Sequence, residues 1–198
     1  MKKDILICGV GGQGTVLASR IIAASAMDEG YTVHSAETIG MAQRGGSVTS
    51  HVRIGEEAFS PLIPAGGADL MIAFEPSEAV RNIKSLSRDA LVIVNSVPVK
   101  PSSGGESGYD GKAETAYLQS KCRCIIVDSE SMCRPFGSSK FFNVAVLGTA
   151  VGAGELGMGE DTIREEIRRN VPERFLEKNL AAFEAGIAKG KEKGNADK

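Results

Sequence analysis

KDILICGVGGQGT, residues 3–15, sets the architecture expected for this chain. Lys3 to Cys8 is an apolar run of strand length that ends in glycines, as a buried parallel strand does. From Gln13 to Asp28 the apolar side chains recur at helical spacing, and Gly30 ends the predicted helix. A strand, a glycine-rich turn and a helix in this order are the opening unit of an α/β protein.

The rest of the chain alternates strand and helix patterns in the same way. Further strands are expected at 31–35, 47–54, 69–74, 90–94 and 121–127, and helices at 77–86, 112–120, 142–153, 161–169 and 172–187. We therefore predict a three-layer Rossmann-like α/β domain: a mostly parallel sheet with helices on both faces and a helical C-terminal segment. Residues 1–188 are expected to form this single domain, 98–111 a surface loop without pattern, and 189–198 a frayed polar tail.

Composition excludes several classes of protein. The chain has 198 residues, of which 42% are hydrophobic and 24% charged, as expected for a globular protein. A net charge of -2 is unsuited to neutralising nucleic-acid phosphates, so no nucleic-acid partner is expected. No apolar run approaches the ~18 residues that a membrane helix needs, and the first strand leaves no room for a signal peptide. These features predict a cytoplasmic protein without a membrane partner.

The first glycine segment has the pattern GxGxxG between a strand and a helix, which brings backbone N–H groups against an anion. Its candidate cofactor-binding residues are Gly9, Gly11, Gly12, Gln13 and Gly14. An independent NAD-dependent oxidoreductase would need a carboxylate at the end of the second strand to hold the ribose. The first candidate, Glu37, is expected beyond that strand. The alternative is a tight turn that only lets the helix pack on the sheet.

A second glycine segment, ETIGMAQRGGSVTSHVR, spans residues 37–53. An arginine directly before two glycines suits a loop that closes on an anionic or carbonyl-rich ligand, since the guanidinium offers a planar fork. The candidates for completing an active site are Arg44, Gly45, Gly46 and Ser47. The alternative is that Arg44 pairs with Glu37 and only pins the loop. His51 is interpreted as a surface or interface histidine.

The cysteines do not form a CxxC pair. Reduced thiols packed as small hydrophobic groups are the expected state, and no iron–sulfur cluster or metal site is predicted on this chain. The four residues are Cys8, Cys122, Cys124 and Cys133.

Four stretches of the sequence resemble those of a known family. GVGGQGTVLASRIIA (9–23), AETIGMAQRGGSVTSHVRIG (36–55), GADLMIAFEPSEAVR (67–81) and VPERFLEKNLAAFEAG (171–186) are similar to the gamma-type domain of the 2-oxoacid:ferredoxin oxidoreductases. MAQRGGSV, residues 41–48, resembles the indolepyruvate branch, in which the small chain is the beta subunit. The 98–111 loop has no counterpart in this resemblance.

The resemblance implies the small subunit of an enzyme complex. In this family an aryl 2-oxoacid is decarboxylated on thiamine diphosphate in the partner (alpha) subunit, iron–sulfur clusters pass electrons to ferredoxin, and the acyl group leaves on coenzyme A. Residues 44–47 would then lie at the inter-subunit surface near the partner's active site, and residues 9–14 on the same surface or against coenzyme A. This chain alone is expected to be inactive and without a bound cofactor. A gamma-type subunit of a pyruvate or 2-oxoglutarate enzyme, and a purely structural subunit, remain alternatives.

Overall fold

The computed structural model describes residues 1–40, 45–56, 59–99 and 108–194. Within them a six-stranded sheet forms the middle layer, with the spatial order β2-β3-β1-β4-β5-β6. The strands are β1 (Lys3–Val10), β2 (Val33–Ile39), β3 (Ser47–Ile54), β4 (Ala68–Ala73), β5 (Leu86–Asn95) and β6 (Arg123–Val127).

The sheet is mixed but mostly parallel, as predicted. β1, β4, β5 and β6 run parallel to one another. β3 is antiparallel to both of its neighbours, β1 and β2. The connection between β2 and β3 is short, so these two strands pair as a hairpin, and the hairpin joins the sheet through β3.

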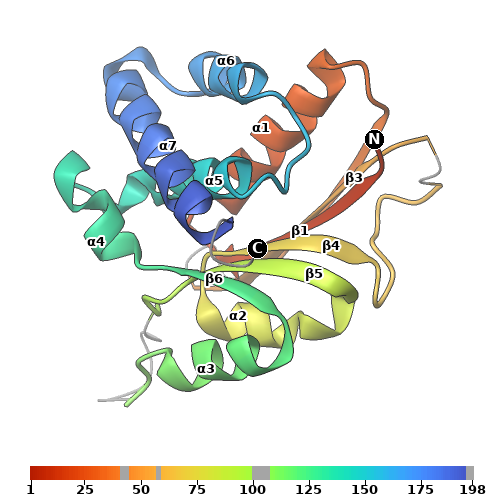
Figure 1. Cartoon of the computed structure of the whole chain (residues 1–198), viewed down its shortest axis with the longest axis vertical. Coiled ribbons are helices and arrows are strands. Elements are labelled where there is room, and N and C mark those ends of the chain that lie inside the picture. Colours follow the sequence, from red (N-terminus) through yellow and green to blue (C-terminus); the bar gives the residue numbers. More distant parts are fainter. Residues whose placement is uncertain (41–44, 57–58, 100–107, 195–198) are drawn as a thin grey trace.

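Helices cover both faces of the sheet (Figure 1), which confirms the three-layer prediction. One face carries α1 (Thr15–Asp28), α5 (Phe142–Gly152), α6 (Glu160–Asn170) and α7 (Glu173–Gly194), and the other carries α2 (Pro76–Arg81) and α3 (Lys112–Lys121). Alternate residues of β1 enter separate cores: Ile5 and Ile7 pack with the first group, Leu6 and Cys8 with the second. The period of two in a strand divides an all-apolar run between two faces.

Short elements connect β6 to α5. They are α4 (Ser129–Cys133) and two 3-10 turns, η2 (Arg134–Phe136) and η3 (Ser139–Phe141). Asp128 caps α4, since its carboxylate accepts a hydrogen bond from the Ser131 amide at 2.7 Å. Another 3-10 turn, η1 (Ile83–Ser85), links α2 to β5. The sequence did not predict α4, because five residues are too few to show a helical period.

β5 begins at Leu86, where the helix 77–86 was expected to end, and β2 and α7 continue several residues past their predicted C-terminal ends. β2 continues to Ile39 instead of ending near Ser35, because pairing with β3 continues as far as Ile39 and Val48. α7 continues to Gly194, past Lys189, where the polar tail was expected to begin. In this part of α7, Gly190 lies directly against the backbone of α5 at Thr149 and Ala153. Tertiary packing therefore prolongs β2 and α7.

Candidate functional site

The first glycine segment lies at the carboxyl edge of the sheet, where its connections change face. α1 follows β1 on one face, whereas α2 follows β4 on the other, as Figure 1 shows. β1 and β4 are neighbours, so the chain leaves them in opposite directions. In open α/β sheets, ligands bind in the crevice that forms at such a switch point.

The glycine loop has a fixed geometry. Gly12 and Gly14 have φ angles of 96° and 85°, in the left-handed region that favours glycine. The side chain of Gln13 accepts a hydrogen bond from the Val10 amide at 2.8 Å and donates one to the Phe74 carbonyl at 2.9 Å. A Cβ on Gly9 would lie 2.7 Å from the same Gln13 oxygen. Gln13, a predicted cofactor-binding residue, therefore uses its amide to join the loop to the end of β4.

A cavity of about 380 Å³ opens beside this loop. Strand ends and helix starts form its walls: Gly12, Gln13, Gly14, Phe74, Asn95, Val97, Pro98, Val99, Ser129, Glu130, Ser139, Lys140, Phe142 and Asn143. α1 and α5 both begin here, and no side chain caps either N-terminus. The N–H groups at the start of α1 and the Lys140 ammonium favour an anion. In the first turn of α5 the Val144 amide already donates to the side chain of Asn143 at 2.9 Å, and Glu130 brings a negative charge to the lining.

Two asparagines shape this cavity. Asn95 donates hydrogen bonds to the Phe74 and Val97 carbonyls at 3.1 and 3.0 Å, and its own side-chain carbonyl accepts from the Ser129 amide at 3.1 Å. It thereby joins the ends of β4, β5 and β6. Asn143 packs against Gly14, where a Cβ would lie 2.5 Å from its Nδ2.

The second glycine segment lies next to the first. The Gly11 amide donates to the Gly46 carbonyl at 2.8 Å, and the Gly40 amide donates to the Ser47 carbonyl at 2.9 Å. Gly45 has a φ of 77°, again in the left-handed region. The two segments singled out in the sequence thus meet at one edge of the sheet. Arg44 lies outside the described residues.

Glu37 is placed differently from expectation. It lies within β2 instead of beyond it, and its carboxylate accepts a hydrogen bond from the Ser19 hydroxyl at 3.1 Å. Because β3 separates β2 from β1, Glu37 lies two strand spacings, about 10 Å, from Ile7 of β1, and it is not on a strand next to the glycine loop. A dinucleotide-binding fold places its ribose carboxylate on the strand next to the loop, so this arrangement speaks against an independent NAD-dependent enzyme.

The four cysteines are free. Burial, together with the nearby Glu78 and Glu75, raises the pKa of Cys8 far above its ordinary value. Burial and the neighbouring Cys122 raise the pKa of Cys124 to about 12. These groups are therefore thiols at neutral pH. Among the described residues, no group of three His, Cys, Asp or Glu side chains could hold a metal ion.

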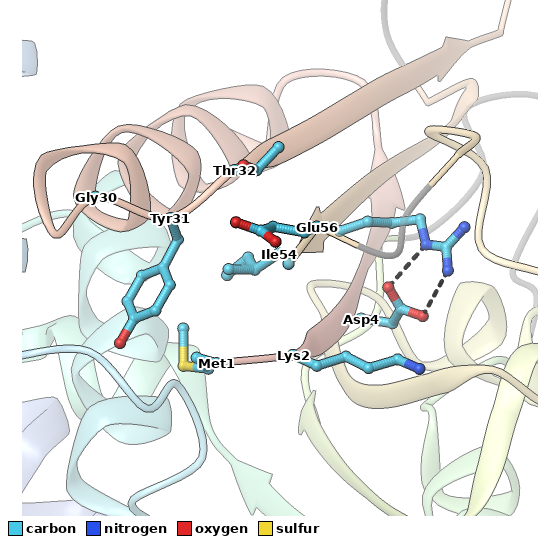
Figure 2. A pocket seen from close by; sticks show the side chains of 10 residues that line it. Met1, Lys2, Asp4, Gly30, Tyr31, Thr32, Ile54 and Glu56 are labelled. Carbon is cyan, nitrogen blue, oxygen red and sulfur yellow. Dashed lines mark hydrogen bonds and ion pairs between the residues drawn. The ribbon is translucent and has the colours of Figure 1, made fainter.

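A larger cavity, about 540 Å³, lies at the opposite edge of the sheet. Figure 2 shows its most polar feature, the double hydrogen bond between Asp4 and the guanidinium group of Arg53, at 2.8 and 3.1 Å. Arg53 also donates to the Ser60 and Leu62 carbonyls, so its charge is used to hold the loop after β3. Nearby, the Nδ1 of His51 accepts from the Ile63 amide at 3.2 Å, while burial and Arg53 lower its pKa. The polar side chains at this edge therefore have a structural role, because they hold neighbouring segments of the fold together.

The sequence of this chain matches a known protein family. A family model described as pyruvate ferredoxin/flavodoxin oxidoreductase matches residues 4–189. The chain belongs to this oxidoreductase family. It is 42% identical to the indolepyruvate oxidoreductase subunit IorB of Archaeoglobus fulgidus, over 94% of both chains, and 34% identical to IorB of Thermococcus kodakarensis, over 96% of both. The family and the indolepyruvate branch that the MAQRGGSV wording indicated are both confirmed.

More distant members of the oxidoreductase family share the fold. The gamma subunit of a keto/oxoacid ferredoxin oxidoreductase from Geobacter sulfurreducens superposes with a TM-score of 0.72 at 22% identity, over 96% of this chain and 99% of that one. The 2-oxoglutarate:ferredoxin oxidoreductase of Magnetococcus marinus gives 0.74 at 19% identity, and this chain corresponds to 31% of its length. In this family the fold can thus occur as a separate chain or within a longer one.

Sequence patterns did not indicate all of the residues that line the cavity. Asn95, Lys140 and Asn143 line the cavity but carry no motif by themselves. Asn95 did offer a signal, since it is a polar residue that ends an apolar strand.

None of the helices in the described part of the chain has the length and the apolar character that a membrane-spanning helix needs.

Proposed function

We propose that this chain is the small (beta) subunit of an indolepyruvate:ferredoxin oxidoreductase, a cytoplasmic complex that converts indolepyruvate or a related aryl pyruvate. The supporting observation is that the sequence of this chain is more similar to a subunit of the indolepyruvate branch than to a subunit of the pyruvate and ketoisovalerate branch. The chain is 42% identical to IorB of Archaeoglobus fulgidus but 27% identical to the common gamma subunit of the pyruvate and ketoisovalerate oxidoreductases of Pyrococcus abyssi. Both alignments cover more than nine-tenths of this chain, so the difference does not come from partial matches.

The proposed reaction consumes a 2-oxoacid, coenzyme A and two oxidised ferredoxins, and it yields an acyl-CoA, CO2, a proton and two reduced ferredoxins. Thiamine diphosphate and iron–sulfur clusters, held by the partner alpha subunit, would supply the decarboxylation and the electron transfer. The role assigned to this chain is to complete that site, to orient coenzyme A and to exclude water.

The carboxyl-edge cavity is the proposed contact for coenzyme A. Coenzyme A carries several phosphate groups, and the uncapped N-terminus of α1 together with Lys140 offers them N–H donors and a positive charge. Gly12 has no neighbouring atom within 4 Å of a Cβ position, so the backbone there stays open to a ligand, whereas Gly14 is covered by the side chain of Asn143. Residues 44–47 would meet the partner on the adjacent surface.

A purely structural subunit is the second candidate. It is favoured by the fact that Gln13, Asn95 and Ser47 all direct their side-chain polar atoms into the fold. In that case the glycine segments are only tight turns, and every ligand contact belongs to the partner.

The test is to produce this chain with and without its alpha subunit and to follow ferredoxin reduction with indolepyruvate, pyruvate and 2-oxoglutarate. We expect activity only in the complex, with indolepyruvate preferred, and a colourless, inactive isolated chain. Preference for pyruvate or 2-oxoglutarate would move the chain to another branch. Stoichiometric iron–sulfur absorbance in the isolated chain would overturn the assignment of the clusters to the partner.

A further inference from the structure

The start of α2 carries two buried glutamates. Glu75 and Glu78 are only 2% and 1% exposed. Burying an acidic group is costly unless hydrogen-bond donors surround it. Each glutamate has at least one local donor and one donor from a segment that is distant in the sequence, so the two side chains join α2 to other parts of the fold.

Glu75 holds the segment before α3. Its carboxylate accepts hydrogen bonds from the Tyr109 hydroxyl and the Ser77 hydroxyl, each at 2.6 Å. Burial and the bond to Glu75 raise the pKa of Tyr109. Tyr109 therefore remains a protonated donor at neutral pH.

Glu78 holds the second glycine segment. Its Oε2 accepts a hydrogen bond from the Ser47 hydroxyl at 2.6 Å, and its Oε1 accepts one from Arg81 at 2.5 Å. The side chain of Arg81 is 68% exposed, so its contact with Glu78 lies at the protein surface and does not connect Glu78 to another segment. Ser47 opens β3 and is absent from the lining of the 380 Å³ cavity. Its hydroxyl is directed at α2 and not at a ligand in that cavity.

Beyond the ladder that pairs Ser47 with Val10, the described residues show three further hydrogen bonds at the base of the β2–β3 connection. Two are between backbone groups: Gly40 to Ser47, and Gly11 to Gly46. Hydrogen bonds between backbone groups can form with many side chains, so these two do not require a particular residue type. The third, from Ser47 to Glu78, depends on both side chains and on the burial of the acceptor.

We propose that Glu78 is a positioning residue which, through the Ser47 hydroxyl, holds the Gly45–Ser47 segment against the glycine loop. Its catalytic consequence rests on the proposed function, because this segment is where the chain is expected to meet its partner. Ser47, predicted to complete the active site, then acts through its neighbours and not on the substrate.

Substitution of Ser47 tests the contact in the full-length isolated chain. Ser47→Ala removes the donor and leaves the buried Glu78 Oε2 without it, whereas Ser47→Thr keeps a hydroxyl at an exposed strand position that tolerates the added methyl group. Tyr109→Phe is the matched control, since it removes the equivalent hydroxyl from Glu75 in the same turn of α2.

The first measurement is amide hydrogen exchange. We expect Ser47→Ala to accelerate exchange of the Gly11 and Gly40 amides, which donate to the carbonyls of Gly46 and Ser47, about tenfold. This is the effect of losing one hydrogen bond to a carboxylate. Ser47→Thr should exchange as the unmodified chain does, and Tyr109→Phe should change exchange only around residues 108–111. Unchanged exchange in Ser47→Ala, or equal acceleration in all three variants, would overturn the proposal.

The second measurement is steady-state turnover of the assembled complex. Ser47→Ala should lower kcat/KM at least threefold, Ser47→Thr should restore it, and Tyr109→Phe should stay within twofold of the unmodified complex. Faster exchange with unchanged kcat/KM would overturn the catalytic consequence. An unmodified complex that is inactive with every 2-oxoacid would contradict the proposed function, and the exchange measurement would still decide the positioning role.

Discussion

Lys140 is the one lysine or arginine among the described residues that line the carboxyl-edge cavity. If this cavity contacts a phosphate of coenzyme A, Lys140→Ala should raise the KM for coenzyme A about fivefold and leave the KM for the 2-oxoacid unchanged. The size follows from an exposed charge pair, worth up to about 1 kcal/mol. Kinetics with each substrate varied separately would show the difference.

A matched lysine provides the control for this measurement. Lys121 ends α3 on the opposite face of the sheet, where its ammonium lies over the Tyr117 ring. Lys121→Ala removes the same charge far from the cavity and should leave both KM values unchanged. If the two variants behave alike, the glycine loop is not the phosphate contact.

Arg44 belongs to the segment that meets the partner in the proposed function. Arg44→Ala should reduce turnover of the complex about 10- to 150-fold, because a charge-assisted hydrogen bond near a desolvated site is worth roughly 1.5–3 kcal/mol. Arg44→Lys keeps the charge but not the planar fork, so it should recover only part of the loss. Turnover within twofold of the unmodified complex in both variants would remove Arg44 from the site.

Between elements, α5 and α7 pack backbone against backbone. Their glycines occupy the contact at a spacing of one helical turn: Gly148, Gly152, Gly186 and Gly190. A Cβ on Gly186 would overlap the carbonyl oxygen of Ala145, and one on Gly148 would overlap that of Phe183. This close approach explains why glycine, a poor helix former, is frequent in these two helices.

The contact between these helices predicts a stability effect. Gly186→Ala should lower the free energy of unfolding by about 1–3 kcal/mol, because overpacking outweighs the gain in helix propensity. Gly108→Ala adds the same methyl group at an exposed position outside the helices, where no atom lies within 4 Å of the new Cβ. Urea unfolding of both variants should show a loss only for Gly186→Ala. Equal stabilities would mean that the helices can separate without cost.

At the scale of the whole molecule, the two glycine segments form one edge that the proposed partner would cover. An obligate subunit interface buries on the order of 2,000 Å² or more. Hydrogen exchange at residues 40–47 should therefore slow when the alpha subunit is bound, compared with the isolated chain. Residues on α3, which covers the other face of the sheet, serve as the internal reference. Unchanged exchange at 40–47 would place the interface elsewhere.

Local chemistry was enough to predict the opening strand, the glycine loop, α1 and the amphipathic strand β3. In β3 the side chains of Val48, Val52 and Ile54 are buried and alternate with less buried ones, as the sequence pattern indicated. Period, turn residues and motif wording are properties of neighbouring residues, so they can be read without knowing the fold.

Only the tertiary structure decided which distant residues meet. The insertion of β3 between β1 and β2 moved Glu37 away from the glycine loop, and no pattern within β2 encodes its neighbour. Likewise, Lys140 and Asn143 reach the cavity through the crossover after β6, and Ser47 finds Glu78 through the pairing of β3 with β1. Such contacts depend on how strands and helices pack across long separations in sequence, whereas the individual elements depend mainly on local periodicity and turns.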